Sequence, residues 1–207
     1  KTVALTNPQH PAPLPVKTLA APVKDHRRGF SVRPPAGWYC APSALGLQLG
    51  QADYLLGGTV VPVVNAMALP VEAGETAAGC AKKTAETAKA TAAEHGMVVK
   101  VLGEGPAKLG KLDGYQFILR QSMAPTPTTA PDKGKAKPNP KPPAAPPVLI
   151  VQRTACVFPK PETPATTKPA DGKNYSLVLI TQGVEAKVAS AMMDKIAAGF
   201  ALLPPPK

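Results

Sequence analysis

Short runs of alternating apolar and polar residues occur along much of the chain, and this period of two is typical of β-strands with one buried face. The predicted strands span residues 30–32, 38–40, 45–49, 59–68, 97–102, 115–123, 148–158 and 175–181. The proline- and glycine-containing stretch 34–37 predicts a tight turn, so the first two strands are expected to form a hairpin. A second turn is predicted at residues 111–114. The later strands are expected to form an antiparallel meander.

Two segments change to the period of an α-helix. Residues 75–95 carry a stripe of small side chains and stop at Gly96, and their charged side chains are expected to face solvent. Residues 184–203 repeat apolar side chains every four positions and stop at the prolines 204–206. The two stripes consist of Ala77, Cys80, Ala81, Thr84, Ala88 and Thr91, and of Val184, Val188, Met192, Ile196 and Phe200. The pattern predicts an α+β fold in which an antiparallel β-sheet is flanked by the two helices.

The distribution of proline divides the chain into a part that can form a hydrophobic core and parts that are expected to be extended. The 207 residues contain 27 prolines and are 44% hydrophobic, which is enough for one domain but not for two. Residues 1–28 lack hydrophobic periodicity and are predicted to be a Pro-rich N-terminal arm. Residues 124–147 and 159–173 are predicted to be Pro/Lys-rich inter-strand loops. The domain is therefore expected at 29–203, with these loops as insertions, and 204–207 as a tail.

The order of these elements resembles that of the PsbP-like family. This family of α/β/α sandwiches includes the extrinsic PsbP subunit of photosystem II and related exported bacterial proteins. The residues that carry the resemblance are Gly29, Phe30, Val32, Pro35, Gly37, Trp38, Gly114, Tyr115, Ile196 and Phe200. The resemblance implies a non-enzymatic module that docks onto a larger complex. The arm and the two insertions depart from the family pattern, and no functional residue is carried over from it.

The chain is expected to be exported rather than to span a bilayer. Its longest apolar stretch, residues 55–69, is interrupted by glycine, proline and asparagine and is shorter than a membrane helix. The first residue is Lys1 rather than methionine, so either a signal peptide has been removed or the numbering begins inside a longer product. We expect a periplasmic or extracellular location, where contact with a membrane surface is compatible with the positive charge.

Three cysteines are compatible with an oxidising compartment but are too few for a disulfide framework. They can form one disulfide and one free thiol, or can be three small buried apolar residues. Cys40 and Cys156 are placed on predicted strands and Cys80 on a predicted helix. A disulfide, should one form, is therefore expected between Cys40 and Cys156.

The sequence offers no catalytic or cofactor-binding motif. It contains no Cys-x-x-Cys, no His-Glu-x-x-His and no phosphate-binding glycine loop, and its acidic residues do not form a paired motif. His10 and His26 lie in or beside the arm, and His95 ends a helix, where a histidine interacts favourably with the helix dipole. We therefore expect neither an enzyme nor a bound metal or other cofactor.

The charge favours acidic partners. Lysine and arginine number 24 against 13 acidic residues, which gives a net charge of +11. Nucleic acid is disfavoured, because only 4% of residues are aromatic and most of these are needed in the core. The expected partner-binding residues are Lys17, Lys24, Arg27, Arg28, Lys133, Lys135, Lys137 and Lys141.

These observations favour a non-enzymatic accessory or scaffold subunit. It is expected to dock onto other subunits of a larger exported or envelope-associated complex, photosynthetic or otherwise, through its extended Pro/Lys-rich segments. The alternative is a free-standing periplasmic or secreted protein that binds a small or acidic ligand.

Overall fold

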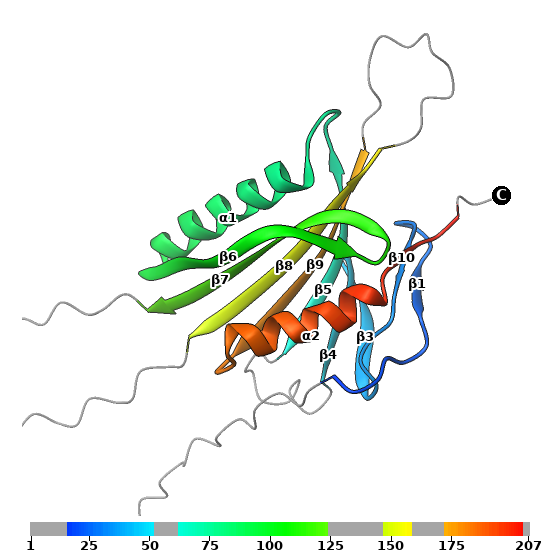
Figure 1. Cartoon of the computed structure of the whole chain (residues 1–207), viewed down its shortest axis with the longest axis horizontal. Helices are drawn as coiled ribbons and strands as arrows, with labels where there is room; N and C mark the ends of the chain where they lie inside the picture. Colours follow the sequence, from blue (N-terminus) through cyan, green and yellow to red (C-terminus); the bar gives the residue numbers. More distant parts are fainter. Residues whose placement is uncertain (1–15, 52–61, 124–146, 159–171, 205–207) are drawn as a thin grey trace, which may run out of the picture.

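The computed structural model describes residues 16–51, 62–123, 147–158 and 172–204. In these ranges two helices pack on a seven-stranded antiparallel sheet, and a three-stranded sheet lies at one side (Figure 1). The large sheet has the order β3 (Trp38–Ser43), β4 (Gly46–Gln51), β5 (Val63–Val71), β9 (Gly172–Gln182), β8 (Val148–Val157), β7 (Leu112–Met123) and β6 (Met97–Leu109). The small sheet has the order β1 (Val23–Asp25), β2 (Phe30–Val32) and β10 (Ala201–Leu202). The predicted α+β fold class is confirmed.

Strands β6 and β7 form a hairpin that is longer than predicted. Leu109 pairs with Leu112, so the turn begins at Gly110 and the predicted turn at 111–114 is displaced. Strand β6 continues past Leu102, through two glycines and a proline, because it is the edge strand of the sheet. An edge position tolerates these residues, since one side of the strand makes no ladder hydrogen bonds.

Alternation along β8 separates the two faces of the large sheet. Leu149 and Val151 belong to the main core, which includes residues of α2 (Ala186–Ala198). Ile150 between them packs instead against the smaller cluster formed with α1 (Ala77–Glu94). The two helices therefore lie on opposite faces of the sheet, as the sequence predicts (Figure 1).

Helix α1 lies close to the sheet because its buried side chains are small. Thr76 caps its first turn, with its hydroxyl oxygen accepting a hydrogen bond from the Gly79 N–H at 3.0 Å. Ala81 and Ala85 pack on Phe117 of β7. The predicted buried stripe was partly wrong, because Thr84 is exposed and donates its hydroxyl to a carbonyl of the preceding turn.

Helix α2 is shorter than the predicted helix at both ends. It begins at Ala186, and after its last residue the chain makes the short strand β10. Val188 is 44% exposed, so the period-four stripe also misplaced one member of the buried face. Phe200 is buried, as predicted, but it lies beyond the helix end. Helix formation stops because the backbone of Ala201 and Leu202 pairs with β2 instead.

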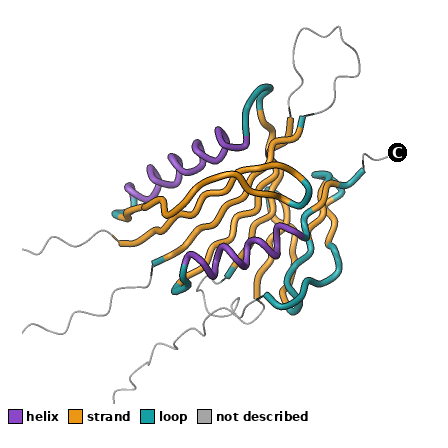
Figure 2. Tube along the Cα trace, viewed as in Figure 1, coloured by secondary structure: helices purple, strands orange, loops and turns teal. Residues whose placement is uncertain are grey.

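The predicted hairpin between residues 30–32 and 38–40 is wrong. Strand β2 pairs with β1 and β10, whereas β3 pairs with β4, so the two segments belong to different sheets. The prolines between them explain the difference, since proline has no N–H to donate to a hairpin ladder. Pro35 instead bridges to Leu19, and the chain passes from the small sheet to the large sheet between β2 and β3. Figure 2 shows the strands in orange and the connecting loops in teal.

The predicted boundary between arm and domain at residue 28 lies too far along the chain. Val16 is 5% exposed and belongs to the main core, and Leu19 packs against that core. The Ala20 N–H donates to the Pro34 carbonyl at 2.8 Å. Residues 16–28 are therefore part of the domain, and residues 1–15 lie outside the described residues.

The predicted insertions fall mostly outside the described residues. Pro147 directly precedes β8, and Gly172 and Lys173 already belong to β9. The second predicted insertion is therefore two residues too long, because a Gly-Lys pair carries no strand signal in the sequence.

Candidate functional site

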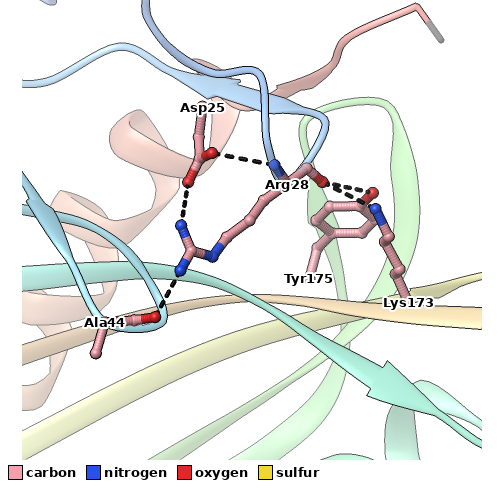
Figure 3. Close-up of polar contacts among 5 residues, drawn as sticks. All are labelled: Asp25, Arg28, Ala44, Lys173 and Tyr175. Carbon is pink, nitrogen blue, oxygen red and sulfur yellow. Dashed lines mark hydrogen bonds and ion pairs between the residues drawn. The ribbon is translucent and has the colours of Figure 1, made fainter. Parts of the chain in front are cut away.

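The turn between β1 and β2 is held in shape by Asp25. Its carboxylate accepts hydrogen bonds from the backbone N–H and from the Nη1 of Arg28, both at 3.0 Å (Figure 3). The Gly29 N–H donates to the Asp25 carbonyl at 2.8 Å. Gly29 has a φ of +81°, which is the left-handed region where glycine is favoured. The turn is thus fixed by its own sequence, Asp-His-Arg-Arg-Gly.

Arg28 also anchors this turn to the rest of the fold. Its Nη2 donates to the Ala44 carbonyl, at the turn between β3 and β4, at 2.5 Å (Figure 3). Its guanidinium therefore contacts both a buried carboxylate and a backbone carbonyl of the large sheet. Arg28 was predicted to bind a partner, but the structure gives its side chain an internal bonding role.

Strand β9 supports the turn from below. The Arg28 carbonyl accepts hydrogen bonds from the Tyr175 hydroxyl at 3.4 Å and from the Lys173 Nζ at 3.3 Å (Figure 3). Burial raises the pKa of Tyr175 above its usual value of 10.0, so the hydroxyl keeps the proton that it donates. The ring of Tyr175 packs edge-on against Phe30 and Phe200, with centroid distances of 6.1 and 5.8 Å.

A cleft of about 460 Å³ opens between this turn and the C-terminal residues. It is lined by His26, Arg27, Gly29, Lys173, Tyr175, Leu202, Leu203 and Pro204, and is here termed the basic cleft. No acidic side chain is among the described residues that line it. His26, Arg27 and Lys173 are exposed, so their positive or ionisable groups are open to solvent beside an apolar wall of leucine and proline.

The remaining predicted partner-binding residues are distributed unevenly. Lys24 is exposed on β1, next to the turn. Lys17 is also exposed and precedes β1 in the chain. Lys133, Lys135, Lys137 and Lys141 lie outside the described residues. Their segment connects β7 to β8 at the end of the sheet where residue 148 pairs with 121 and 182. The basic cleft lies at the opposite end, where β9 begins.

About half of the residues that line the basic cleft were not predicted from the sequence to be part of a site. The sequence pattern places Lys173 in a predicted insertion, and residues 202–204 in a predicted helix end and tail. They join Arg27 because β10 pairs with β2 and because β9 lies below the turn. No local pattern could have indicated this, since the contacts join positions far apart in the sequence.

A second groove of about 400 Å³ lies between α1 and the β6–β7 hairpin. It is lined by Ala81, Lys82, Ala85, Glu86, Lys89, Val101, Glu104, Tyr115 and Phe117. Lys89 and Glu86 form an ion pair at 2.7 Å, so part of its charge is compensated within the helix. Charges of both signs line this groove, which makes it less selective for an acidic ligand than the basic cleft.

The predicted Cys40–Cys156 pair is not brought together. Strands β4, β5 and β9 separate β3 from β8, which places the two cysteines about 19 Å apart across the sheet at the usual strand spacing, and the register offsets them further along the strands. A disulfide needs Cα atoms within about 7 Å, so this pairing is wrong. The Sγ atoms of Cys80 and Cys156 lie 3.5 Å apart instead.

Within the described ranges the structure contains no group of three or more His, Cys, Asp or Glu side chains arranged to hold a metal ion. The helices of the same ranges are also too short or too polar to cross a membrane.

Comparison with known proteins identifies the fold. No protein-family model matches the sequence, and no curated protein matches it at a significant level. The solution structure of cyanobacterial PsbP (CyanoP) from Synechocystis sp. PCC 6803 is similar, with a TM-score of 0.54 and 10% identity over 88% of this chain and 91% of that chain. The crystal structure of LpqN, involved in cell envelope biogenesis of Mycobacterium tuberculosis, has a TM-score of 0.50 and 13% identity over 89% and 90%. The chain therefore has the PsbP-like fold that its order of elements predicts.

Proposed function

We propose that the protein is a non-enzymatic accessory subunit that docks an acidic segment of a partner protein into the basic cleft. The observation that carries this proposal is the composition of the cleft. Cationic and ionisable side chains surround it, no described acidic residue lines it, and its wall is apolar. An extended acidic peptide with apolar side chains would satisfy both the charge and the wall.

The cleft is suited to binding because its support is rigid. The Asp25–Arg28 pair fixes the turn, and the aromatic cluster of Phe30, Tyr175 and Phe200 fixes the strands below it. A preformed site loses less conformational entropy on binding than a site that must be ordered. Arg27 makes no ion pair with another described residue, so a partner carboxylate need not displace an internal one.

We also propose that the protein acts outside the cytoplasm, at the envelope. Support comes from the fold, which it shares with LpqN, a protein of cell envelope biogenesis in its own organism. The segment that carries Lys133, Lys135, Lys137 and Lys141 is proposed as a second contact with the same acidic assembly.

The experiment is affinity capture from native envelope with matched charge variants. The partner should be retained by the wild type and lost on Arg27→Glu, with affinity reduced at least tenfold, or about 1.4 kcal/mol. Lys100→Glu is the control, because Lys100 is also exposed but lies near the other end of the sheet. Equal capture by both variants would refute docking in the cleft. Changing the four insertion lysines to glutamine tests the second contact separately.

A second candidate function is a free-standing protein that binds a small or acidic ligand. The groove of about 400 Å³ beside α1 favours it, since Phe117 and Tyr115 provide an apolar floor there. This function predicts a monomer on sizing whose melting temperature rises with a small ligand. The rise should disappear in Val101→Trp, which would fill the groove from an exposed lining position, and persist in Arg27→Glu.

A further inference from the structure

The structure places two of the three cysteines in direct contact. Cys80 lies in the first turn of α1, and Cys156 lies near the end of β8, on the face of the sheet that α1 covers. Their Sγ atoms are 3.5 Å apart, although the residues are 76 positions apart in the sequence. We propose that Cys80 and Cys156 form the disulfide of this domain and that Cys40 remains a thiol.

Secondary structure makes this contact specific. The Cys80 N–H donates to the Thr76 carbonyl at 2.9 Å, which fixes Cys80 in the capped first turn. Cys156 pairs with Asn174 in the central part of the sheet, so its position is fixed by β9. A disulfide has an S–S distance of about 2.05 Å, so the sulfur atoms need to approach by about 1.5 Å, which a side-chain rotation can supply.

The packing of α1 explains what the bond adds. Among the described residues, the buried cluster beneath this helix consists of four residues, with four partly buried ones packed against it, whereas the cluster on the α2 face is much larger. The four buried residues are Ala81, Ala85, Phe117 and Leu119. Alanine buries little apolar area, so α1 is held weakly by packing alone. A covalent bond at its first turn would fix the helix to β8 and limit its separation from the sheet.

The reaction is a thiol–disulfide exchange with an external disulfide. Two thiols lose two protons and two electrons, and the oxidant, a protein disulfide oxidase or oxidised glutathione, is reduced to two thiols. The attacking species is a thiolate, and burial raises the pKa of both cysteines, that of Cys156 to about 12. Exchange is therefore slow in the folded protein, and the bond is expected to form while the chain folds, before α1 covers Cys156.

Peptide mapping tests the pairing directly on the full-length chain. The protein is refolded with a mixture of oxidised and reduced glutathione, alkylated, and digested without reduction. Trypsin leaves Cys40 and Cys80 on one peptide, because no lysine or arginine lies between residues 34 and 81, so a protease that cuts after Glu72 and Glu75 is added. We expect a linked Cys80–Cys156 peptide pair and an alkylated Cys40.

Stability provides an independent measurement. Closing a loop of this length restricts the unfolded chain strongly, so reduction should lower the melting temperature by about 10 °C. The fall should be equal in Cys40→Ser, the matched control, and absent in the Cys80→Ser/Cys156→Ser double variant. Three alkylated thiols after oxidative refolding, or a linked peptide that contains Cys40, would overturn the proposal. The mapping needs no partner, so its result is independent of docking in the basic cleft.

Discussion

The packing of Phe200 gives the sharpest test of how this fold is held together. Phe200 is 3% exposed and stacks on Phe30 at a centroid distance of 5.5 Å, while Tyr175 meets its edge at 5.8 Å. Replacing a buried phenylalanine by alanine costs about 3–5 kcal/mol through lost burial and the cavity that remains. Each aromatic pair adds about 0.5–1.5 kcal/mol beyond burial. Since Phe200 makes two such pairs, we expect Phe200→Ala to cost at least about 4 kcal/mol.

Urea unfolding measures this cost. Trp38 is the only tryptophan and is half-buried against the main core, so its fluorescence should report the transition, with circular dichroism as a second signal. The matched control is Val188→Ala. Val188 is 44% exposed, so its replacement should change the free energy of unfolding by no more than about 0.5 kcal/mol.

The two variants separate the sequence pattern from the structure. Spacing by four residues places Val188 and Phe200 on the same helical stripe, which predicts comparable losses. The structure predicts a large loss of unfolding free energy for Phe200→Ala and almost none for Val188→Ala. A cost below about 1 kcal/mol for Phe200→Ala, or an equal cost for both variants, would refute the packing described for the C-terminal residues.

Three further predictions concern the turns and the thiols. Arg28→Ala should cost about 1–3 kcal/mol in urea unfolding, because Asp25 keeps a buried carboxylate that has lost its cation. Gly110→Ala should lower the melting temperature more than Gly96→Ala. Both residues have a positive φ, but only at Gly110 would a methyl group lie 2.1 Å from a backbone carbonyl oxygen. In the reduced protein, burial raises the pKa of Cys156 from 9.0 to about 12, so its protonated form is favoured on folding. Stability should be full below pH 9, fall as pH rises toward 12, and fall less in Cys156→Ala.

Much of the large sheet could be predicted because its signal is local. Phe117 and Leu119 alternate with polar neighbours, and this alternation indicates a strand with one buried face whatever its partners are. The stop at Gly96 similarly indicates the end of α1. These features depend on residues within one element, and they were sufficient for the fold class and the likeness to PsbP.

The small sheet could not be predicted because its pairing is not local. Residues 201 and 202 pair with 31 and 30, and nothing near either segment indicates the other. The apolar period of α2 continues into Phe200, so the pattern alone extends the helix too far. Two short strands gain stability only when a distant third segment joins them, which is a property of the folded chain rather than of any window of sequence.

In the candidate site, the sequence shows which residues are charged, but only the structure shows where their side chains lie. The sequence predicts that Arg27 and Arg28 both bind a partner. In the structure, the side chain of Arg27 is exposed to solvent, whereas that of Arg28 binds Asp25 and Ala44. Adjacent arginines thus have different roles, and only a structure distinguishes them. Lys173 was missed because its significance depends on the register of β9 below the turn.

The net charge of +11 therefore does not act as a single attractive surface. The basic cleft lies where β9 begins, and the connection that carries the four insertion lysines starts where β9 ends, about 30 Å away along the strand from residue 173 to residue 182. At physiological salt, charge interactions are screened over about 8 Å. A described cation near the far end of the sheet, such as Lys100, therefore contributes little to the potential in the basic cleft. We therefore expect binding at the proposed docking site to depend on the local arrangement of Arg27, His26 and Lys173 beside the apolar wall of the basic cleft.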